Sequence, residues 1–118
     1  MIYNELCKTI ANLHKSIEVA IILSKNKLVA SYLKTGGPMP EEGEFRSMLS
    51  QIETIIKTIK ANEDTFGSLE FVVIHYKYID GLLFPIGQND TLVVGIVQPY
   101  DYDILNKILT ITSQRKDI

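Results

Sequence analysis

The chain has 118 residues, of which 46% are hydrophobic and 22% are charged, and its formal net charge is −2. This length and composition predict one folded domain over residues 1–118 and exclude a disordered chain. The charges are interspersed, so no basic patch indicates binding to nucleic acid. The apolar runs are too short to span a bilayer, Cys7 is the single cysteine, and no signal peptide is recognisable. We therefore expect a cytoplasmic protein without direct membrane insertion.

The N-terminal part predicts a helix followed by a hairpin. Apolar residues recur every three or four positions over about residues 2–15, which is typical of one helix face. Two β-rich runs, 17–23 and 28–33, predict a hairpin in which Asn26 best tolerates a left-handed backbone conformation. The first run is apolar on both faces apart from Glu18, so we expect a central strand.

The middle of the chain contains the clearest helical pattern. Thr35–Pro40 is rich in glycine and proline and predicts a loop. A helix is predicted over about residues 42–61, because large apolar residues recur at spacings of three and four from Phe45 to Ile59. The acidic residues at its start suit the positive end of the helix dipole.

The C-terminal half predicts three strands and a short helix. The residues 69–78 predict a long strand, and Asp80-Gly81 after it is a hairpin signal. Strands over 82–86 and 91–97 complete a meander, and a helix over about 102–113 closes the chain. The predicted fold class is therefore α+β, with a single five-stranded antiparallel sheet and the order α-β-β-α-β-β-β-α.

The sequence contains no recognisable catalytic or metal-binding motif. His75 could be a general base, but no nucleophile accompanies it, and we interpret it as a half-exposed strand or interface residue. Cys7 is interpreted as a small core residue, and Asp101 and Asp103 as helix-start charge. We predict no enzyme activity, no catalytic residue, no metal site and no cofactor.

The apolar surface exceeds what one sheet and three helices can easily cover. The central helix has a wide apolar stripe, and the strand over 69–78 is apolar or aromatic on both faces. Large exposed apolar patches usually mark interfaces, so we expect a dimer or partner contact. The predicted interface residues are Phe45, Met48, Ile52, Ile55, Ile56, Ile59, Phe71, Val73 and His75.

The order of elements, the opening run Glu18–Leu23 and the segment Asp80–Val94 together resemble the Roadblock (dynein light-chain roadblock) superfamily, which is related to longin and profilin-like folds. The resemblance covers nearly the whole chain, as a single Roadblock-like domain. One departure is Lys25-Asn26-Lys27, where family members often have an acid-glycine turn. The resemblance implies a homodimer, or a heterodimer with a paralogue, in which central helices pack together and middle strands pair edge to edge. It also implies a platform for a small Ras-like GTPase.

Two functional hypotheses follow. The first is a non-enzymatic homodimeric regulator or scaffold of a small Ras-like GTPase, acting on GTP hydrolysis or exchange by stabilising one switch conformation. Arg46 could then act as an arginine finger, although a solvated helix residue is the simpler interpretation. The alternative is a longin-like or profilin-like small-ligand sensor, or an assembly subunit of a larger complex.

Overall fold

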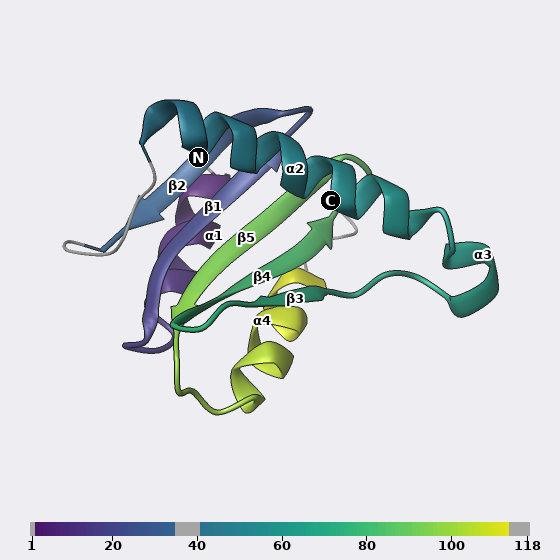
Figure 1. Cartoon of the computed structure of the whole chain (residues 1–118). Helices are drawn as coiled ribbons and strands as arrows, with labels where there is room; N and C mark the ends of the chain where they lie inside the picture. Colours follow the sequence, from purple (N-terminus) through teal and green to yellow (C-terminus); the bar gives the residue numbers. More distant parts are fainter. Residues whose placement is uncertain (1, 35–40, 114–118) are drawn as a thin grey trace.

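The computed structural model describes residues 2–34 and 41–113, and the predicted loop Thr35–Pro40 lies outside the described residues. The elements in chain order are α1 Ile2–Ala11, β1 Ile17–Ser24, β2 Lys27–Leu33, α2 Glu42–Lys60, α3 Glu63–Phe66, β3 Val72–His75, β4 Ile79–Ile86, β5 Asp90–Val97 and α4 Asp103–Ser113. The five strands form one antiparallel sheet in the order β2-β1-β5-β4-β3. Helix α2 crosses one face of the sheet, and α1 and α4 cover the other (Figure 1). The predicted fold class is confirmed.

The first helix ends earlier than its apolar pattern predicts. After Ala11, the amide of Leu13 bonds the carbonyl of Ile10, which tightens the last turn. The amide of Ser16 then donates to Nδ1 of His14 at 3.0 Å, so the backbone leaves the helix. Leu13 still packs against the core, which explains its place in the helical pattern.

The β1–β2 hairpin forms as predicted. Lys25 and Asn26 both have positive φ, at 51° and 65°, and Ser24 pairs with Lys27 across the turn. Two consecutive left-handed residues twist a two-residue turn in the same sense as its strands. Strand β1 pairs with β2 on one side and with β5 on the other, so its predicted central position is confirmed.

The β4–β5 hairpin contains a proline, Pro85, near the end of β4. Pro85 pairs with Thr91 of β5, whereas β3 starts its pairing with β4 at Leu83. Pro85 therefore lies beyond the part of β4 that β3 covers, where a missing amide donor breaks no ladder. Gly87 follows with φ of 61° and opens the turn to β5.

Two predictions about the β3 region are wrong. The strand is four residues long, not ten, because the amide of Leu69 donates to Oε2 of Glu63 at 2.6 Å and does not enter a ladder. Asp80 and Gly81 do not form the hairpin turn but lie within β4. The turn lies before them, where the amide of Tyr76 bonds the carbonyl of Ile79. The predicted turn after α2 also contains the one-turn helix α3.

The sheet separates two layers of apolar side chains. Alternate residues of β4 and β5 face opposite sides, so Phe84 packs toward α1 and α4 while Leu83 packs toward α2. The layer against α1 and α4 is the larger one and includes fully buried residues from both helices. The layer under α2 is smaller, with Leu49, Ile52 and Ile56 as the buried helix side chains. Among the described residues, no helix is long and apolar enough to cross a membrane.

Candidate interaction surface

An open groove lies between α2 and the sheet. It has a volume of about 450 Å³ and is lined mainly by apolar side chains. Phe45, Met48 and Ile55 form its helix side. We call this hollow the α2 groove; its floor consists of Val19, Ile79, Gly81 and Gly95 together with neighbouring strand residues. The groove exists because α2 alone covers this face of the sheet (Figure 1).

Two facing glycines make the groove deep. Gly81 of β4 pairs directly with Gly95 of β5, and both lie on the face toward α2. A Cβ atom at Gly95 would lie 2.7 Å from Cγ1 of Val19, so any larger residue at this position would force Val19 to shift. A Cβ atom at Gly81 would find Ile74 Cβ at 3.9 Å as its nearest neighbour, which is ordinary contact. Gly81 therefore leaves space that a side chain could fill.

The C-terminal end of α2 and the helix α3 extend past the end of the sheet at which β3 begins (Figure 1). We call the segment Lys57–Phe66 the overhang. The side chain of Phe66 is 84% exposed, and Ile59 is also exposed. No residue of α3 is buried. The overhang thus presents apolar side chains that its own sheet does not cover.

The overhang is nevertheless fixed by backbone contacts. The amides of Thr65 and Phe66 both donate to the carbonyl of Asn62, and the amide of Gly67 donates to that of Glu63. Gly67 then reverses the chain with φ of 89°, a conformation that favours glycine. A second hollow of about 380 Å³ lies under this turn, between Ile59 and Phe71.

The structure divides the predicted interface residues into three groups. Ile52 and Ile56 are buried against the sheet and belong to the core of the single chain. Phe45, Met48 and Ile55 are half-buried and line the α2 groove, and Ile59 lies on the overhang. The third group consists of Phe71, Val73 and His75, which do not line the α2 groove.

The strand residues lie on the opposite side of the sheet. Val73 pairs with Leu82, and His75 pairs with Asp80, so both point to the face that carries α4. Phe71 packs against Phe84 on that face, with ring centroids 5.7 Å apart. The sequence pattern assigned these residues to one face of β3 correctly, but it could not show that α2 covers the other one.

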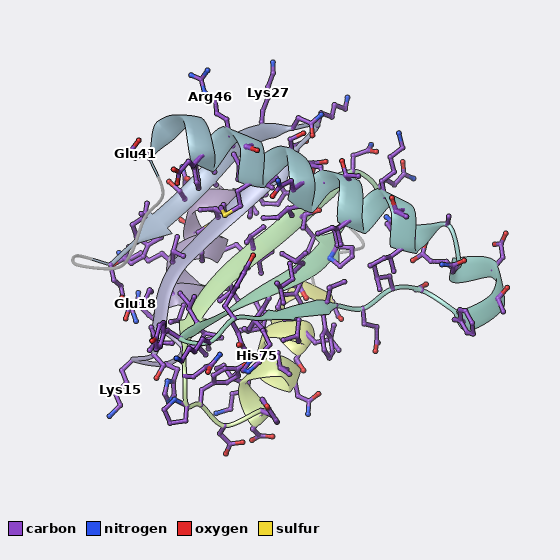
Figure 2. The ribbon with its side chains drawn as sticks, in the orientation of Figure 1. Lys15, Glu18, Lys27, Glu41, Arg46 and His75 are labelled. Atoms are coloured by element: carbon purple, nitrogen blue, oxygen red, sulfur yellow. The ribbon has the colours of Figure 1, made fainter. Side chains whose placement is uncertain are left out.

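A polar network holds the end of β3. The carboxylate of Asp80 is buried, with 2% exposure, and it accepts hydrogen bonds from the hydroxyl of Tyr100 and from the amide of Gln98 at 2.6 Å. Its Oδ1 also lies 2.6 Å from Nδ1 of His75, whose side chain is 67% exposed. The Gln98 amide further donates to the carbonyl of Tyr76 at 2.7 Å. These bonds tie the β3–β4 turn to the segment that follows β5. Figure 2 labels His75 at this end of the sheet.

Burial and hydrogen bonding set the pKa values in this network and in the core. Burial alone would raise the pKa of Asp80, but the hydrogen bonds from Tyr100, His75 and Gln98 together lower it below its ordinary value. Burial, with the Asp80 carboxylate beside it, raises the pKa of the Tyr100 hydroxyl. Burial raises the pKa of Cys7 to about 11, which suits an inert core thiol. Within residues 2–34 and 41–113, no cluster of three or more His, Cys, Asp or Glu side chains could hold a metal ion.

Sequence reasoning missed the groove floor and the overhang. Gly81 was interpreted as part of a turn, since an aspartate before a glycine is a common turn signal. Only the strand register shows that it faces Gly95. The overhang was missed because its exposed position depends on how far α2 extends beyond β3. The apolar Phe66 within a polar segment was the available signal.

No family model matches the chain, and no curated protein matches it in sequence. Solved structures do match its fold. A Roadblock/LC7 domain from Streptomyces avermitilis is 12% identical, with a TM-score of 0.73 over 94% of this chain and 91% of that one. MglC from Myxococcus xanthus is 12% identical, with a TM-score of 0.71 and full coverage of both chains. A structure described as MglB with tetrameric arrangement is 10% identical, with a TM-score of 0.76 over 95% and 82%. The chain therefore has the Roadblock fold.

Proposed function

We propose that this protein is a non-enzymatic, cytoplasmic homodimer that serves as a binding platform for a small Ras-like GTPase. The Roadblock fold supports this proposal, since the resemblance of the sequence to that superfamily implies both a dimer and a GTPase partner. The observation that carries it is the open α2 groove beside the unpaired edge of β3. Uncovered apolar surface next to a free strand edge is suited to association with a second chain.

The regulatory effect follows from selective binding. A rigid dimer that binds one switch conformation of a GTPase more tightly than another shifts the population toward the first. The size of the shift depends only on the difference between the two affinities. No catalytic residue of this chain is needed for such an effect.

Light scattering during size-exclusion chromatography tests the dimer first. The expected mass is close to twice 13.3 kDa.

Ile55→Asp should give a folded monomer, because Ile55 is half-buried and lines the groove. The matched change Ile56→Asp should instead unfold the chain, because a lone buried carboxylate costs several kcal/mol. A stable dimer carrying Ile55→Asp would contradict this use of α2.

The alternative function, a small-ligand sensor, is favoured by one observation. The α2 groove has a volume within the range of ligand pockets, about 300–1,000 Å³, and apolar side chains line most of it. A thermal-shift screen with nucleotides and small metabolites distinguishes the two functions. Reproducible stabilisation of a monomeric protein by one compound would favour the sensor over the platform.

A further inference from the structure

We propose that a cluster of lysines on the β1–β2 hairpin turn and on α2 binds a short acidic segment of a partner protein. The lysine cluster consists of Lys25, Lys27, Lys57 and Lys60. The inference goes beyond the proposed homodimer and does not depend on it, because the cluster lies away from the α2 groove. Lys25 and Lys27 also belong to the turn that departs from the acid-glycine turn of the resembling family.

The hairpin turn is held against α2 by a hydrogen bond. The amide of Asn26 donates to Oε1 of Glu53 at 3.2 Å, which joins segments 27 residues apart in the sequence. Figure 1 shows the tip of this hairpin beside α2. Lys25 and Lys27 are exposed on either side of Asn26, and Figure 2 shows the Lys27 side chain extending away from the sheet. The fold therefore gathers lysines that are interspersed among other charges in the sequence.

The other two lysines come from one flank of α2. With 3.6 residues per turn, Lys57 and Lys60 follow Glu53 by one and two turns and share its flank. Met48 and Ile55, which line the α2 groove, lie on the other flank of the helix. A second chain that covers the groove would therefore leave the lysine cluster accessible.

The charges along α2 limit the cluster to a small area. The cluster contains one carboxylate, that of Glu53, in a chain whose net charge is −2. Arg46 lies seven residues before Glu53 on the same flank, and residues 41, 42 and 44 at the start of the helix are acidic. Glu63 and Asp64 follow beyond Lys60. Acidic residues thus lie at both ends of α2.

Two of the neighbouring carboxylates are already engaged. Oε2 of Glu63 accepts the amide of Leu69 at 2.6 Å, so this carboxylate is turned toward the chain that leads into β3. Asp90 pairs with Ser24 beside the hairpin turn, but its carboxylate accepts the hydroxyl of Tyr3 on α1. Helix α1 covers the opposite face of the sheet. The positive charge of the cluster is therefore opposed mainly by Glu53 and, at the helix end, by Asp64.

This arrangement favours a short acidic protein segment over a larger polyanion. Glu53 and Lys60 are about 10 Å apart along the helix axis. A bilayer surface or a nucleic acid duplex extends farther and would meet the acidic residues at both ends of α2. Leu28, which is 43% exposed, follows Lys27 and faces the α2 side, because it pairs with Leu23 of that layer. An exposed leucine beside lysines gives a protein partner an apolar contact as well.

Fluorescence anisotropy with a labelled peptide of about eight glutamates tests the site, in about 0.1 M salt, where charges more than about 10 Å apart are largely screened. Lys25→Glu/Lys27→Glu should weaken binding about fivefold, since two attractive charges become repulsive. The matched control is Lys8→Glu/Lys107→Glu, which makes the same change in net charge at exposed positions of α1 and α4. The control should bind within about twofold of the wild-type affinity. Lys57→Glu/Lys60→Glu decides the outcome if the hairpin variant does not fold.

Removal of the carboxylate within the cluster should have the opposite effect. Glu53→Gln keeps an acceptor for the amide of Asn26 but removes a negative charge, so the peptide should bind about twofold more tightly. Glu44→Gln, at the groove, makes the same change in net charge and should leave the affinity unchanged.

The outcomes decide both the site and the class of partner. Loss of affinity confined to the cluster variants, with a gain in Glu53→Gln, would support the inference. It would be overturned by a wild-type protein that does not bind the peptide, or by equal weakening in both lysine double variants. Tighter binding of phosphatidylserine vesicles or of duplex DNA through the same lysines would overturn the assignment to a protein partner. A monomeric wild-type protein in light scattering would contradict the proposed homodimer alone.

Discussion

The two faces of the sheet differ in how fully the helices of the chain cover them. On one face, α1 and α4 cover a layer whose largest member, Phe84, is fully buried. On the other face, α2 alone covers the sheet and leaves a groove of about 450 Å³. The same strands supply both faces, because their side chains alternate. The first face is covered by two helices of the chain itself, whereas the second keeps an open groove beside its single helix.

Under the proposed function, this contrast predicts that stability depends on one face of the sheet and association on the other. We call the face covered by α1 and α4 the sealed face. Substitutions on the sealed face should unfold the single chain. Substitutions in the α2 groove should change association while the single chain stays folded. The predictions below, ordered by the size of the expected effect, test that separation.

The largest effect is expected for Phe84→Ala. Removal of a fully buried aromatic side chain that also packs against Phe71 leaves a cavity in the sealed face. The free energy of unfolding should fall by about 4 kcal/mol. Urea unfolding followed by circular dichroism measures this loss. A loss below about 1 kcal/mol would mean that this face is not the main source of stability.

A smaller effect is expected for Asp80→Ala, at the margin of the sealed face. The change leaves the Tyr100 hydroxyl without its acceptor and leaves the Gln98 amide with the Tyr76 carbonyl but without the carboxylate, which should cost about 2 kcal/mol. The pKa of Asp80 is lowered in the folded state, so the carboxylate contributes fully above its unfolded pKa of about 3.9. That contribution is lost as the pH falls through the folded pKa.

The pH dependence gives the control for this variant. Wild-type stability, measured by urea unfolding between pH 7 and pH 2, should fall at the acidic end. The slope in that range should be smaller in Asp80→Asn, which has no carboxylate to protonate. An identical slope in both proteins would show that other acidic groups determine it.

A still smaller effect on the single chain is expected for Phe45→Ala, in the α2 groove. Because Phe45 is half-buried at the groove wall, its removal should lower the free energy of unfolding by only about 1 kcal/mol. The comparison with Phe84→Ala should be made at protein concentrations below the dimer dissociation constant. Equal losses in the two variants would contradict the difference between the faces.

No effect on GTP hydrolysis is expected for Arg46→Ala. Arg46 lies near the start of α2 and is exposed, and Figure 2 shows its side chain extending away from the sheet. A scaffold that acts by selective binding needs no arginine finger. The hydrolysis rate of the partner GTPase should remain within about twofold of the wild-type rate, and a hundredfold loss would make Arg46 catalytic.

The sequence predicted the sheet and its helices because their signals are local. The apolar run in 91–97, the helical spacing from Phe45 to Ile59 and the tolerance of Asn26 for a left-handed backbone depend on near neighbours. The groove depends on distant ones. The space at Gly81 exists only because the strand register places Gly95 opposite, and no local pattern encodes that pairing. Of the predicted interface residues, the core positions Ile52 and Ile56 could not be separated from groove positions, since all share one apolar stripe.

The second free edge of the sheet, β2, bears on how far assembly can proceed. A sheet with two equally adhesive edges would polymerise, because each added copy would offer a new edge. Strand β2 differs from β3: its pairing with β1 contains a bulge between Ile22 and Leu23, and it begins at an exposed lysine, Lys27. Bulges and edge lysines both oppose the addition of further strands. If copies join through β3, assembly stops at two copies, and the two β2 strands form the outer edges of the dimer, to which no further strand adds.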